Sequence, residues 1–461
     1  MMKKEFGFVA GVMVIALHSA TALAAVSEEE AKALGTSLTE FGAEKQASAD
    51  GTIPAYNGGL TTAPADFDPK SGLIPDPFKD EKPLYTITGK NMAQYADRLS
   101  PGVQALLKRF PTYHVDVFPT HRTMHYPQWV LDNTVKNATT AKLVGKVKGD
   151  GVEGAFGGIP FPIPKDGYEV MFNSALNFQR TQYENQAKAW LVDSAGNRSE
   201  LPENDANDYR PYYDRALAQG KAPHNAYDVY HVVQVSPPTG VGTAVLVYTP
   251  INNATDEQVT WLYMPGQRRT RMAPDYKYDT PISQFGGVMF WDDLGLYHGR
   301  MDRFDFKVIG KKEMIVPYSS YKYLSMSPDQ LFGKQHLNPD AIRWETHRVW
   351  VVEATLKQGE RHAYSKRTLY IDEDTWAIVE ADAYDPEGKL WKVGFMYTFN
   401  YYDGGGGTFN AIYNIYDLQK GDYFGTNAGG PANGRPFIRP FDTHQKESLF
   451  TPAGMSGTGM H

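Results

Sequence analysis

From about residue 181 to residue 420, the chain repeats short stretches in which apolar and polar residues alternate. This alternation is typical of strands that bury one face, because successive side chains of a strand point to opposite sides. Turn-forming residues follow each stretch, at the spacing of consecutive antiparallel hairpins. The pattern predicts strands at Tyr183–Val192, Val229–Val235, Thr243–Thr249, Gln258–Met264, Arg303–Ile309, Glu313–Val316, Trp344–Leu356, Ser365–Ile371, Ala377–Tyr384, Leu390–Tyr401 and Ala411–Leu418.

The two faces of these strands differ in chemistry. In 344–356 the tryptophans Trp344 and Trp350 share one parity, and Glu345 and His347 share the other. Such a division predicts one large antiparallel sheet with an apolar face and a solvated face. His347 is then expected at the surface.

Helical periodicity is confined to the region before residue 144. It predicts helices at Ser27–Lys45, at Asn91–Phe110 with a break at Pro101, and at Pro127–Leu143. Between the first two, Asp50–Pro83 is rich in proline and glycine and is either an extended arm over the domain or a disordered linker. Because the apolar face of a sheet must be covered, we expect these helices to close it partly, leaving either an aromatic-lined cavity or a filled core.

The first residues have the three parts of a secretory signal peptide. Two lysines precede the apolar run Phe6–Leu17, and the small residues Ala22 and Ala24 suit a cleavage site. The run is shorter than the roughly 20 residues that cross a bilayer, so a cleaved signal is favoured over a retained anchor. We therefore expect export to the Gram-negative periplasm.

Cysteine is absent and the formal net charge is −7. Without cysteine the chain has no disulfide, no thiolate metal site, no cysteine nucleophile and no attachment point for a lipoprotein lipid. The mildly acidic charge argues against nucleic acid as a partner.

Several motifs resemble those of one family of exported bacterial proteins, the family of unknown function DUF1329. The matching segments are Asp50–Tyr56, Glu153–Pro162, Trp261–Arg269, Gly310–Met314, His347–Ala354 and Tyr370–Trp376. The family is similar in architecture to outer-membrane lipoprotein-sorting proteins of the LolA and LolB type. This resemblance implies an α+β fold that is mainly β, in which a large curved antiparallel sheet forms an unclosed half-barrel with helices over its concave face.

The resemblance also implies an organisation and partners. We divide the chain into a signal peptide (1–24), N-terminal helices and arm (25–144), the half-barrel (145–424) and an irregular tail (425–461), with the second part integrated into the half-barrel. Members of the family are often encoded beside an exporter of the resistance-nodulation-division (RND) type and an outer-membrane companion. A role in moving a hydrophobic substance across the periplasm follows by analogy.

Signals for catalysis are weak. No nucleophile elbow or zinc-protease motif is present, and the glycine-rich stretch 151–164 lacks the ending of a phosphate-binding loop and is interpreted as a structural turn. The acidic turn Asp372–Asp374 lacks calcium-loop spacing and is interpreted as solvated, as are Asp292 and Asp293. We expect no enzyme, catalytic residue, metal or cofactor.

The sequence thus favours a carrier of a hydrophobic, lipid-like ligand, and the alternative is a protein-interaction or envelope-sensing module without lipid transfer. Arg268, Arg269 and Arg271 follow a strand end, where they are either a solvated turn or a site for a phosphate or carboxylate head group. The candidate apolar lining is Leu262, Met264, Phe304, Phe306, Trp344, Trp350, Phe395 and Tyr397.

Overall fold

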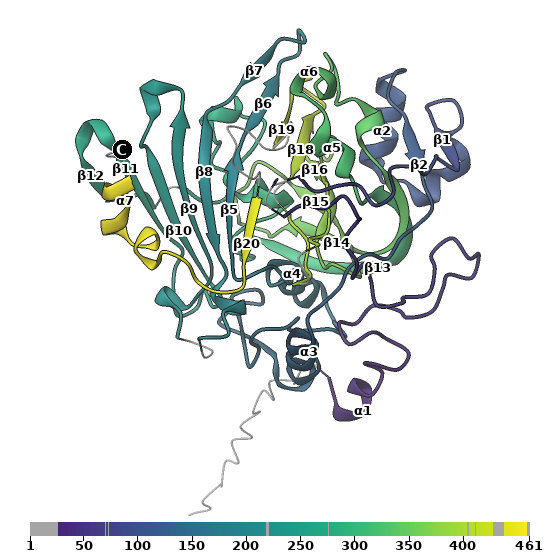
Figure 1. Ribbon diagram of the computed structural model, residues 1–461, viewed down its shortest axis with the longest axis horizontal. Coiled ribbons are helices and arrows are strands. Elements are labelled where there is room, and N and C mark those ends of the chain that lie inside the picture. The colour runs from purple at the N-terminus through teal and green to yellow at the C-terminus, as the bar shows by residue number, and fades with distance from the viewer. Residues whose placement is uncertain are drawn as a thin grey trace, which may run out of the picture.

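A computed structural model describes residues 26–458, except 70, 72, 218–220, 275, 403–404, 411 and 427–437. The predicted signal peptide lies outside this part of the chain. The regular secondary structure of the described chain is mainly β, in two large sheets that together form a strongly curved, unclosed wall (Figure 1). The predicted fold class is confirmed.

The larger sheet has 11 strands, and almost all of its neighbours pair antiparallel. The exception is a short parallel pairing of β2 with β14. Its strands are β1 (Tyr85–Ile87), β2 (Val115–Val117), β6 (Ala189–Val192), β7 (Arg198–Glu200), β13 (Phe304–Pro317), β14 (Trp344–Leu356), β15 (Lys366–Asp372), β16 (Ile378–Tyr384), β17 (Leu390–Met396), β18 (Tyr413–Asp417) and β19 (Tyr423–Thr426).

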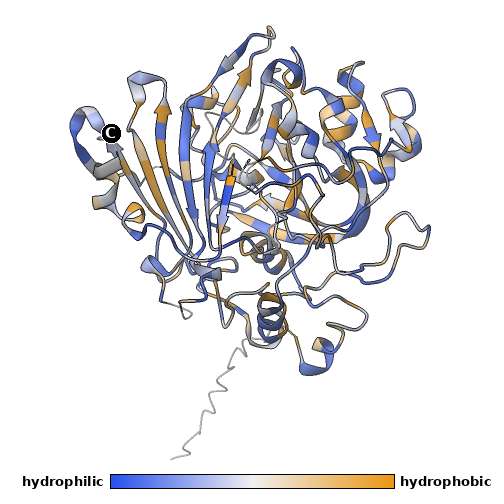
Figure 2. Cartoon of the chain, viewed as in Figure 1, coloured by the Kyte–Doolittle hydropathy of each residue, from blue (hydrophilic) through white to orange (hydrophobic). Residues whose placement is uncertain are grey.

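The smaller sheet has 7 strands in the order β12-β11-β10-β9-β8-β5-β20. Along it β8 is mostly hydrophilic and β10 mostly hydrophobic (Figure 2). A separate pair joins β3 (Lys142–Val144) and β4 (Gly151–Glu153). The strands of the smaller sheet are β5 (Gln182–Ala187), β8 (Glu203–Tyr209), β9 (Ala226–Ser236), β10 (Ala244–Pro250), β11 (Val259–Met264), β12 (Arg269–Met272) and β20 (Ile438–Phe441).

One long hairpin joins the two sheets. The chain runs from β5 through Lys188 directly into β6, and it returns through β7 into β8. Because β5 and β8 pair in the smaller sheet while β6 and β7 pair in the larger one, the hairpin passes from one sheet to the other. The sequence predicted Tyr183–Val192 as one strand, and the structure divides it at the bend.

The helices are short. Of the predicted helices, the first extends over only four residues, the second breaks before Pro101 as predicted, and the third is present with Pro127 at its N-cap. The helices are α1 (Glu28–Ala31), α2 (Pro101–Arg109), α3 (Gln128–Thr140), α4 (Gly167–Ala175), α5 (Tyr321–Ser325), α6 (Pro328–Leu331) and α7 (Pro452–Thr458). Short 3-10 turns are η1 (Met92–Arg98), η2 (Pro211–Tyr213), η3 (Pro223–Asn225), η4 (Pro238–Gly240), η5 (Pro265–Gln267), η6 (Ser283–Phe285), η7 (Trp291–Leu296), η8 (Pro339–Ala341) and η9 (Glu447–Phe450).

Both faces of the larger sheet are covered. On β17, Val393 faces α2, where a methyl group added to Gly102 would come 2.6 Å from its Cγ1 atom. The next residue, Gly394, faces η7, where an added methyl group would come 2.6 Å from Cδ2 of Leu296. Adjacent strand residues point to opposite sides, so the sheet is sandwiched between two layers. The predicted solvated face is therefore wrong for this part of the sheet, whereas Asp305 and Lys307 at the start of β13 are exposed as predicted.

The polar residues assigned to that face are buried. His347 is 1% exposed, Tyr318 stacks on its ring at 3.8 Å, and its Nε2 atom lies 3.1 Å from Oε2 of Glu345. Burial opposes a charge on this imidazole, but the hydrogen bond to Glu345 and the nearby Asp372 outweigh burial and raise the pKa of His347. The surface position predicted for His347 is wrong, because alternation alone does not reveal a second covering layer.

The two acidic turns are buried as well, which corrects their interpretation as solvated. Arg122 donates to both carboxylate oxygens of Asp374 at 2.8 and 2.6 Å. Arg367 donates to Asp292 at 2.8 Å and to Asp293 at 2.9 Å. These bonds satisfy charges that burial alone would make very costly.

The C-terminal segment also differs from the predicted irregular tail. Its described part adds β20 to the smaller sheet and continues into η9 and α7. Phe450 and Met455 pack there with Tyr209, Leu246 and Tyr263 of the sheet. The segment thus covers one face of the smaller sheet, which its weak periodicity did not indicate.

Phe450→Ala tests this cover. We expect a loss of about 3–5 kcal/mol of unfolding free energy, because a large buried ring is removed. Glu447→Ala, an exposed change in the same turn, should stay within about 0.5 kcal/mol of wild type. Urea unfolding measures both variants, and equal midpoints would show that the segment does not cover the sheet.

The burial of the polar face can be tested through the pH dependence of stability that Glu380 and Asp382 cause. Both are buried beneath the start of α2, where Ser100 donates to Glu380 and the Gly102 amide donates to Asp382 at 3.2 Å. Burial raises the pKa of Asp382 to about 7, and burial with repulsion from Asp382 raises the pKa of Glu380 well above its usual value. The folded state therefore holds protons that the unfolded chain releases near pH 4.

This pair should stabilise the fold fully below about pH 4, and its contribution should fade as pH rises through about 7. Asp382→Asn should be more stable than wild type at pH 8, by on the order of 1–3 kcal/mol, and should lose that advantage at pH 4. Asp305→Asn, on a side chain that is 73% exposed, is the control. Unfolding curves of Asp382→Asn that parallel wild type across this pH range would contradict the account.

Candidate functional site

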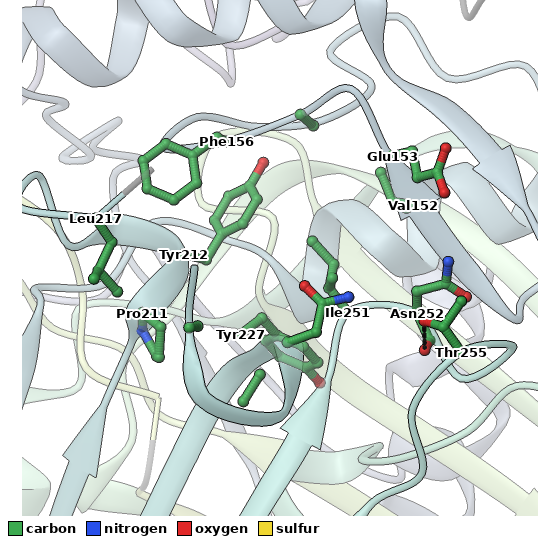
Figure 3. A pocket seen from close by; sticks show the side chains of 14 residues that line it. Val152, Glu153, Phe156, Pro211, Tyr212, Leu217, Tyr227, Ile251, Asn252 and Thr255 are labelled. Carbon is green, nitrogen blue, oxygen red and sulfur yellow. Dashed lines mark hydrogen bonds between the residues drawn. The ribbon is translucent and has the colours of Figure 1, made fainter. Parts of the chain in front are cut away.

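A cavity of about 230 Å³ lies at one end of the smaller sheet, where β4 and η2 meet the start of β9 and the end of β10 (Figure 3). Its lining comes from three stretches that are distant in the sequence, 152–156, 211–227 and 251–255. The lining residues are Val152, Glu153, Ala155, Phe156, Pro211, Tyr212, Leu217, Ala222, Asn225, Ala226, Tyr227, Ile251, Asn252 and Thr255.

Backbone hydrogen bonds place one wall of the cavity. The Val152 amide donates to the Ile251 carbonyl at 3.2 Å, and the Asn253 amide donates to the Asp150 carbonyl at 2.6 Å. These bonds dock β4 against the chain that leaves β10. Gly151 permits the approach, because a methyl group there would come 2.6 Å from Cα of Asn252.

The glycine-rich stretch places the aromatic wall. Gly157 has a φ of +64° and donates its amide to the carbonyl of Tyr212 at 3.0 Å. The Tyr212 hydroxyl donates in return to the carbonyl of Gly158 at 2.7 Å. The interpretation of this stretch as a structural turn is confirmed, and the turn fixes Phe156 beside Tyr212 with ring centroids 5.8 Å apart.

The cavity has an apolar side and a polar side. Phe156, Leu217 and Tyr212 lie together on one side, and Glu153, Asn252 and Thr255 lie on the other (Figure 3). The Asn252 side chain is held in place, because its Oδ1 atom accepts the Ala254 amide at 2.9 Å. Such a division, mainly apolar with a few oriented polar groups, is typical of sites for small organic ligands.

A group of charged residues adjoins the cavity through Tyr227. Arg210 lies 2.9 Å from Asp208 and 3.6 Å from Asp228. Burial raises the pKa of Asp208 to about 7, although the charge of Arg210 acts in the opposite direction. Burial likewise raises the pKa of Tyr227, so this hydroxyl stays neutral beside the cavity at ordinary pH.

The structure distributes the predicted aromatic lining over two packed cores. Phe304, Phe306 and Trp350 belong to the core that includes α4 and η7. Trp344, Phe395 and Tyr397 belong to the core that includes α2, and the rings of Trp344 and Phe395 lie 5.4 Å apart. None of these six residues lines the cavity.

The other predicted site residues lie together, at the end of the smaller sheet away from the cavity. Leu262 pairs with Arg271 and Met264 with Arg269 across β11 and β12, and Arg268 forms the turn between these strands. The three arginines are exposed. β10 separates them from the cavity, because Tyr263 pairs with Ala244 at the start of that strand and the cavity adjoins its other end. This separation corresponds to about 20 Å at 3.3 Å per residue.

Sequence reasoning missed the actual cavity lining. Phe156, Tyr212, Tyr227 and Ile251 come from different turns and strand ends, and alternation along a strand says nothing about such junctions. The proline before Tyr212 and the glycines before Ile159 marked turns, but nothing in the sequence showed that these turns meet.

Comparison with known proteins agrees with the motifs. A family model described as a protein of unknown function (DUF1329) matches residues 86–456. An uncharacterized protein of Pseudomonas aeruginosa is 38% identical over 461 residues and covers 98% of both chains.

The solved structures to which the chain is similar are more distant. A DUF1329 family protein from Desulfovibrio piger has 15% identity and a TM-score of 0.42, over 62% of this chain and 95% of that one. A domain from Vibrio parahaemolyticus described as an outer membrane lipoprotein-sorting protein has 14% identity and a TM-score of 0.41, over 61% of this chain and 95% of that one. Likenesses of this degree carry no argument, whereas the family match spans most of the chain. The chain therefore belongs to DUF1329.

Proposed function

We propose that this protein is a periplasmic carrier that binds a hydrophobic, lipid-like ligand in the cavity beside β4. The observation that supports the proposal is the mainly apolar cavity of about 230 Å³ bounded by Phe156, Tyr212, Tyr227 and Ile251. Apolar cavities of about 150 Å³ hold benzene, so this space is large enough for a ring system or the end of an alkyl chain. It is smaller than the pockets that enclose drug-sized ligands, which start near 300 Å³.

The size of the cavity limits the affinity. Removing about 200 Å² of apolar ligand surface from water contributes about 5 kcal/mol at 25 cal/mol per Å². The loss of translational and rotational freedom opposes this gain. By itself the apolar term corresponds to a Kd of about 0.2 mM, so hydrogen bonds on the polar side of the cavity must supply the additional affinity that keeps a ligand bound.

The polar side of the cavity favours a neutral or cationic head group. Glu153 brings a carboxylate, and Asn252 and Thr255 bring neutral polar groups. A hydroxyl or an amine matches these partners better than a phosphate does. Arg268, Arg269 and Arg271, with Leu262 and Met264, remain a proposed second contact surface for an anionic group at the far end of the sheet.

The proposal also includes a location and partners. Residues 1–24 would direct export to the periplasm, where the protein would work with an RND-type exporter and an outer-membrane companion. Within the described residues, no helix has the length and apolarity needed to cross a membrane.

A second candidate function is protein interaction at the free edge of the smaller sheet. β12 is the last strand of that sheet, and its Met272 is 61% exposed next to exposed arginines. A strand edge of this kind can pair with a partner's extended segment. Capture of an envelope protein without lipid, abolished by Met272→Pro, would favour this alternative.

Ala222→Trp tests the cavity directly. Ala222 lines the cavity and is only partly buried, so an indole there should occupy the space with little cost to the fold. We expect at least a tenfold loss of affinity for the neutral probe N-phenyl-naphthylamine, measured by fluorescence titration. Dodecanol should displace the probe from wild type.

Ala195→Trp is the matched control, because Ala195 lies exposed in the β6–β7 turn and the same indole there leaves the cavity open. It should bind the probe as wild type does. Wild type that takes up no probe, or equal binding by both variants, would exclude the cavity as the ligand site.

A further inference from the structure

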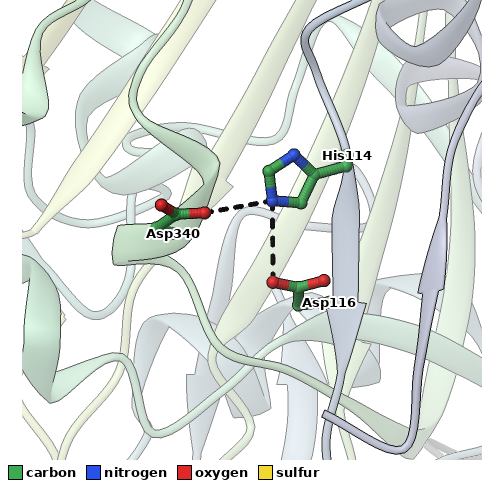
Figure 4. A group of neighbouring side chains, drawn as sticks. All are labelled: His114, Asp116 and Asp340. Carbon is green, nitrogen blue, oxygen red and sulfur yellow. Dashed lines mark hydrogen bonds and ion pairs between the residues drawn. The ribbon is translucent and has the colours of Figure 1, made fainter.

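Three metal-ligating side chains meet at a place that the proposed ligand site does not use. His114 and Asp116 are two residues apart on the extended segment that forms β2, and Asp340 lies in η8 (Figure 4). The intervening Val115 and the following Val117 are buried. Alternation along the strand therefore turns His114 and Asp116 to the same outer side, toward η8.

The distances fit a shared cation. Nε2 of His114 lies 3.2 Å from Oδ1 of Asp340 and 3.5 Å from Oδ2 of Asp116, and the three donor atoms lie within 4.8 Å of one another. Tetrahedral zinc with bonds of 2.0–2.1 Å has ligand atoms about 3.3–3.4 Å apart. The two measured separations lie close to that value.

Hydrogen bonding explains the arrangement less completely. A ring nitrogen carries one proton, which serves one acceptor well. Nε2 of His114 is within hydrogen-bond distance of Asp340 and only within ion-pair distance of Asp116. A cation between the three groups would serve both carboxylates at once.

Neighbouring groups orient the ligands. The Thr86 hydroxyl donates to Oδ1 of Asp116 at 2.5 Å, which leaves Oδ2 turned toward His114. The Asp340 amide donates to the Asn338 side chain at 3.1 Å, which fixes the turn that carries Asp340. Such outer contacts are a usual feature of metal sites, because they hold first ligands in place.

We propose that His114, Asp116 and Asp340 bind a divalent transition-metal ion, with zinc as the best match and a water molecule in the fourth position. One imidazole nitrogen and two carboxylate oxygens suit zinc better than calcium or magnesium, which prefer oxygen ligands alone. The partial exposure of the three side chains, 26%, 19% and 58%, gives an ion and its water access.

The bound ion would join distant parts of the chain. His114 and Asp340 are separated by 226 residues, and η8 leads directly into β14 of the larger sheet. The ion would bind the folded state alone, because the unfolded chain does not hold these ligands together. It should therefore raise the unfolding temperature.

The test is a zinc titration of untagged, metal-stripped protein by calorimetry, with thermal unfolding as a second readout. Wild type should bind one zinc ion in the micromolar range and melt several degrees higher with zinc. His114→Ala and Asp340→Asn should each lose at least tenfold in affinity and the thermal shift. Cobalt in place of zinc should give the visible absorption of a tetrahedral site in wild type only.

His121→Ala is the matched control. This histidine is also partly exposed, and its Nε2 atom pairs with a single carboxylate, that of Glu81, at 2.7 Å. Its loss should leave zinc binding unchanged. An absence of saturable binding in wild type, or equal binding by wild type and His114→Ala, would overturn the proposal.

Discussion

The architecture depends on covering both faces of the larger sheet. A strand that is buried on both sides has no solvent for its charged residues, so every charge must find a partner inside. Arg122 with Asp374 and Arg367 with Asp292 and Asp293 meet this demand through short, charge-assisted bonds. Removing one partner of such a pair typically costs about 3–5 kcal/mol, because the other charge stays buried. These pairs therefore bind the covering layers to the sheet, and Arg367 in particular fastens η7.

The same constraint decides where free space remains. The larger sheet is filled on both sides by interlocking aromatic and aliphatic side chains. The cavity lies at the junction of the smaller sheet with β4 and η2, where separate turns meet. A ligand would therefore bind beside the curved wall and not within its packed core. This placement differs from the aromatic-lined cavity over the larger sheet that the sequence predicted. The proposed ligand is still a hydrophobic, lipid-like molecule.

Strand positions could be predicted closely where alternation was strong. The strand predicted at Trp344–Leu356 has those bounds in the structure, because branched and aromatic residues favour a pleated, buried surface. The strand predicted at Leu390–Tyr401 begins as expected but ends at Met396. The sequence did not predict β8, because Glu203–Tyr209 is polar and has a low propensity for strands. Backbone pairing with β5 and β9 on its two sides stabilises the strand instead. The expected N-terminal helix ended after Ala31 because turns at Gly35 and Gly42, both with positive φ, take over the chain.

The candidate site was less predictable for a physical reason. Parity along a strand shows that two faces differ, but not whether a second layer covers the polar face, as it does over His347. It also says nothing about which turns meet, as at Tyr212 and Ile251, or about His114 and Asp340, which meet across 226 residues. The family motifs predicted more than the periodicity did, because they identified the family. They did not locate the cavity or its lining residues.

Native mass spectrometry of the protein isolated from its own cell envelope tests the central claim most directly. The account predicts a population heavier than the chain alone by one small hydrophobic molecule, which organic extraction releases and the Ala222→Trp variant lacks. A single mass equal to the bare polypeptide, with no extractable ligand, would contradict a carrier role for the cavity.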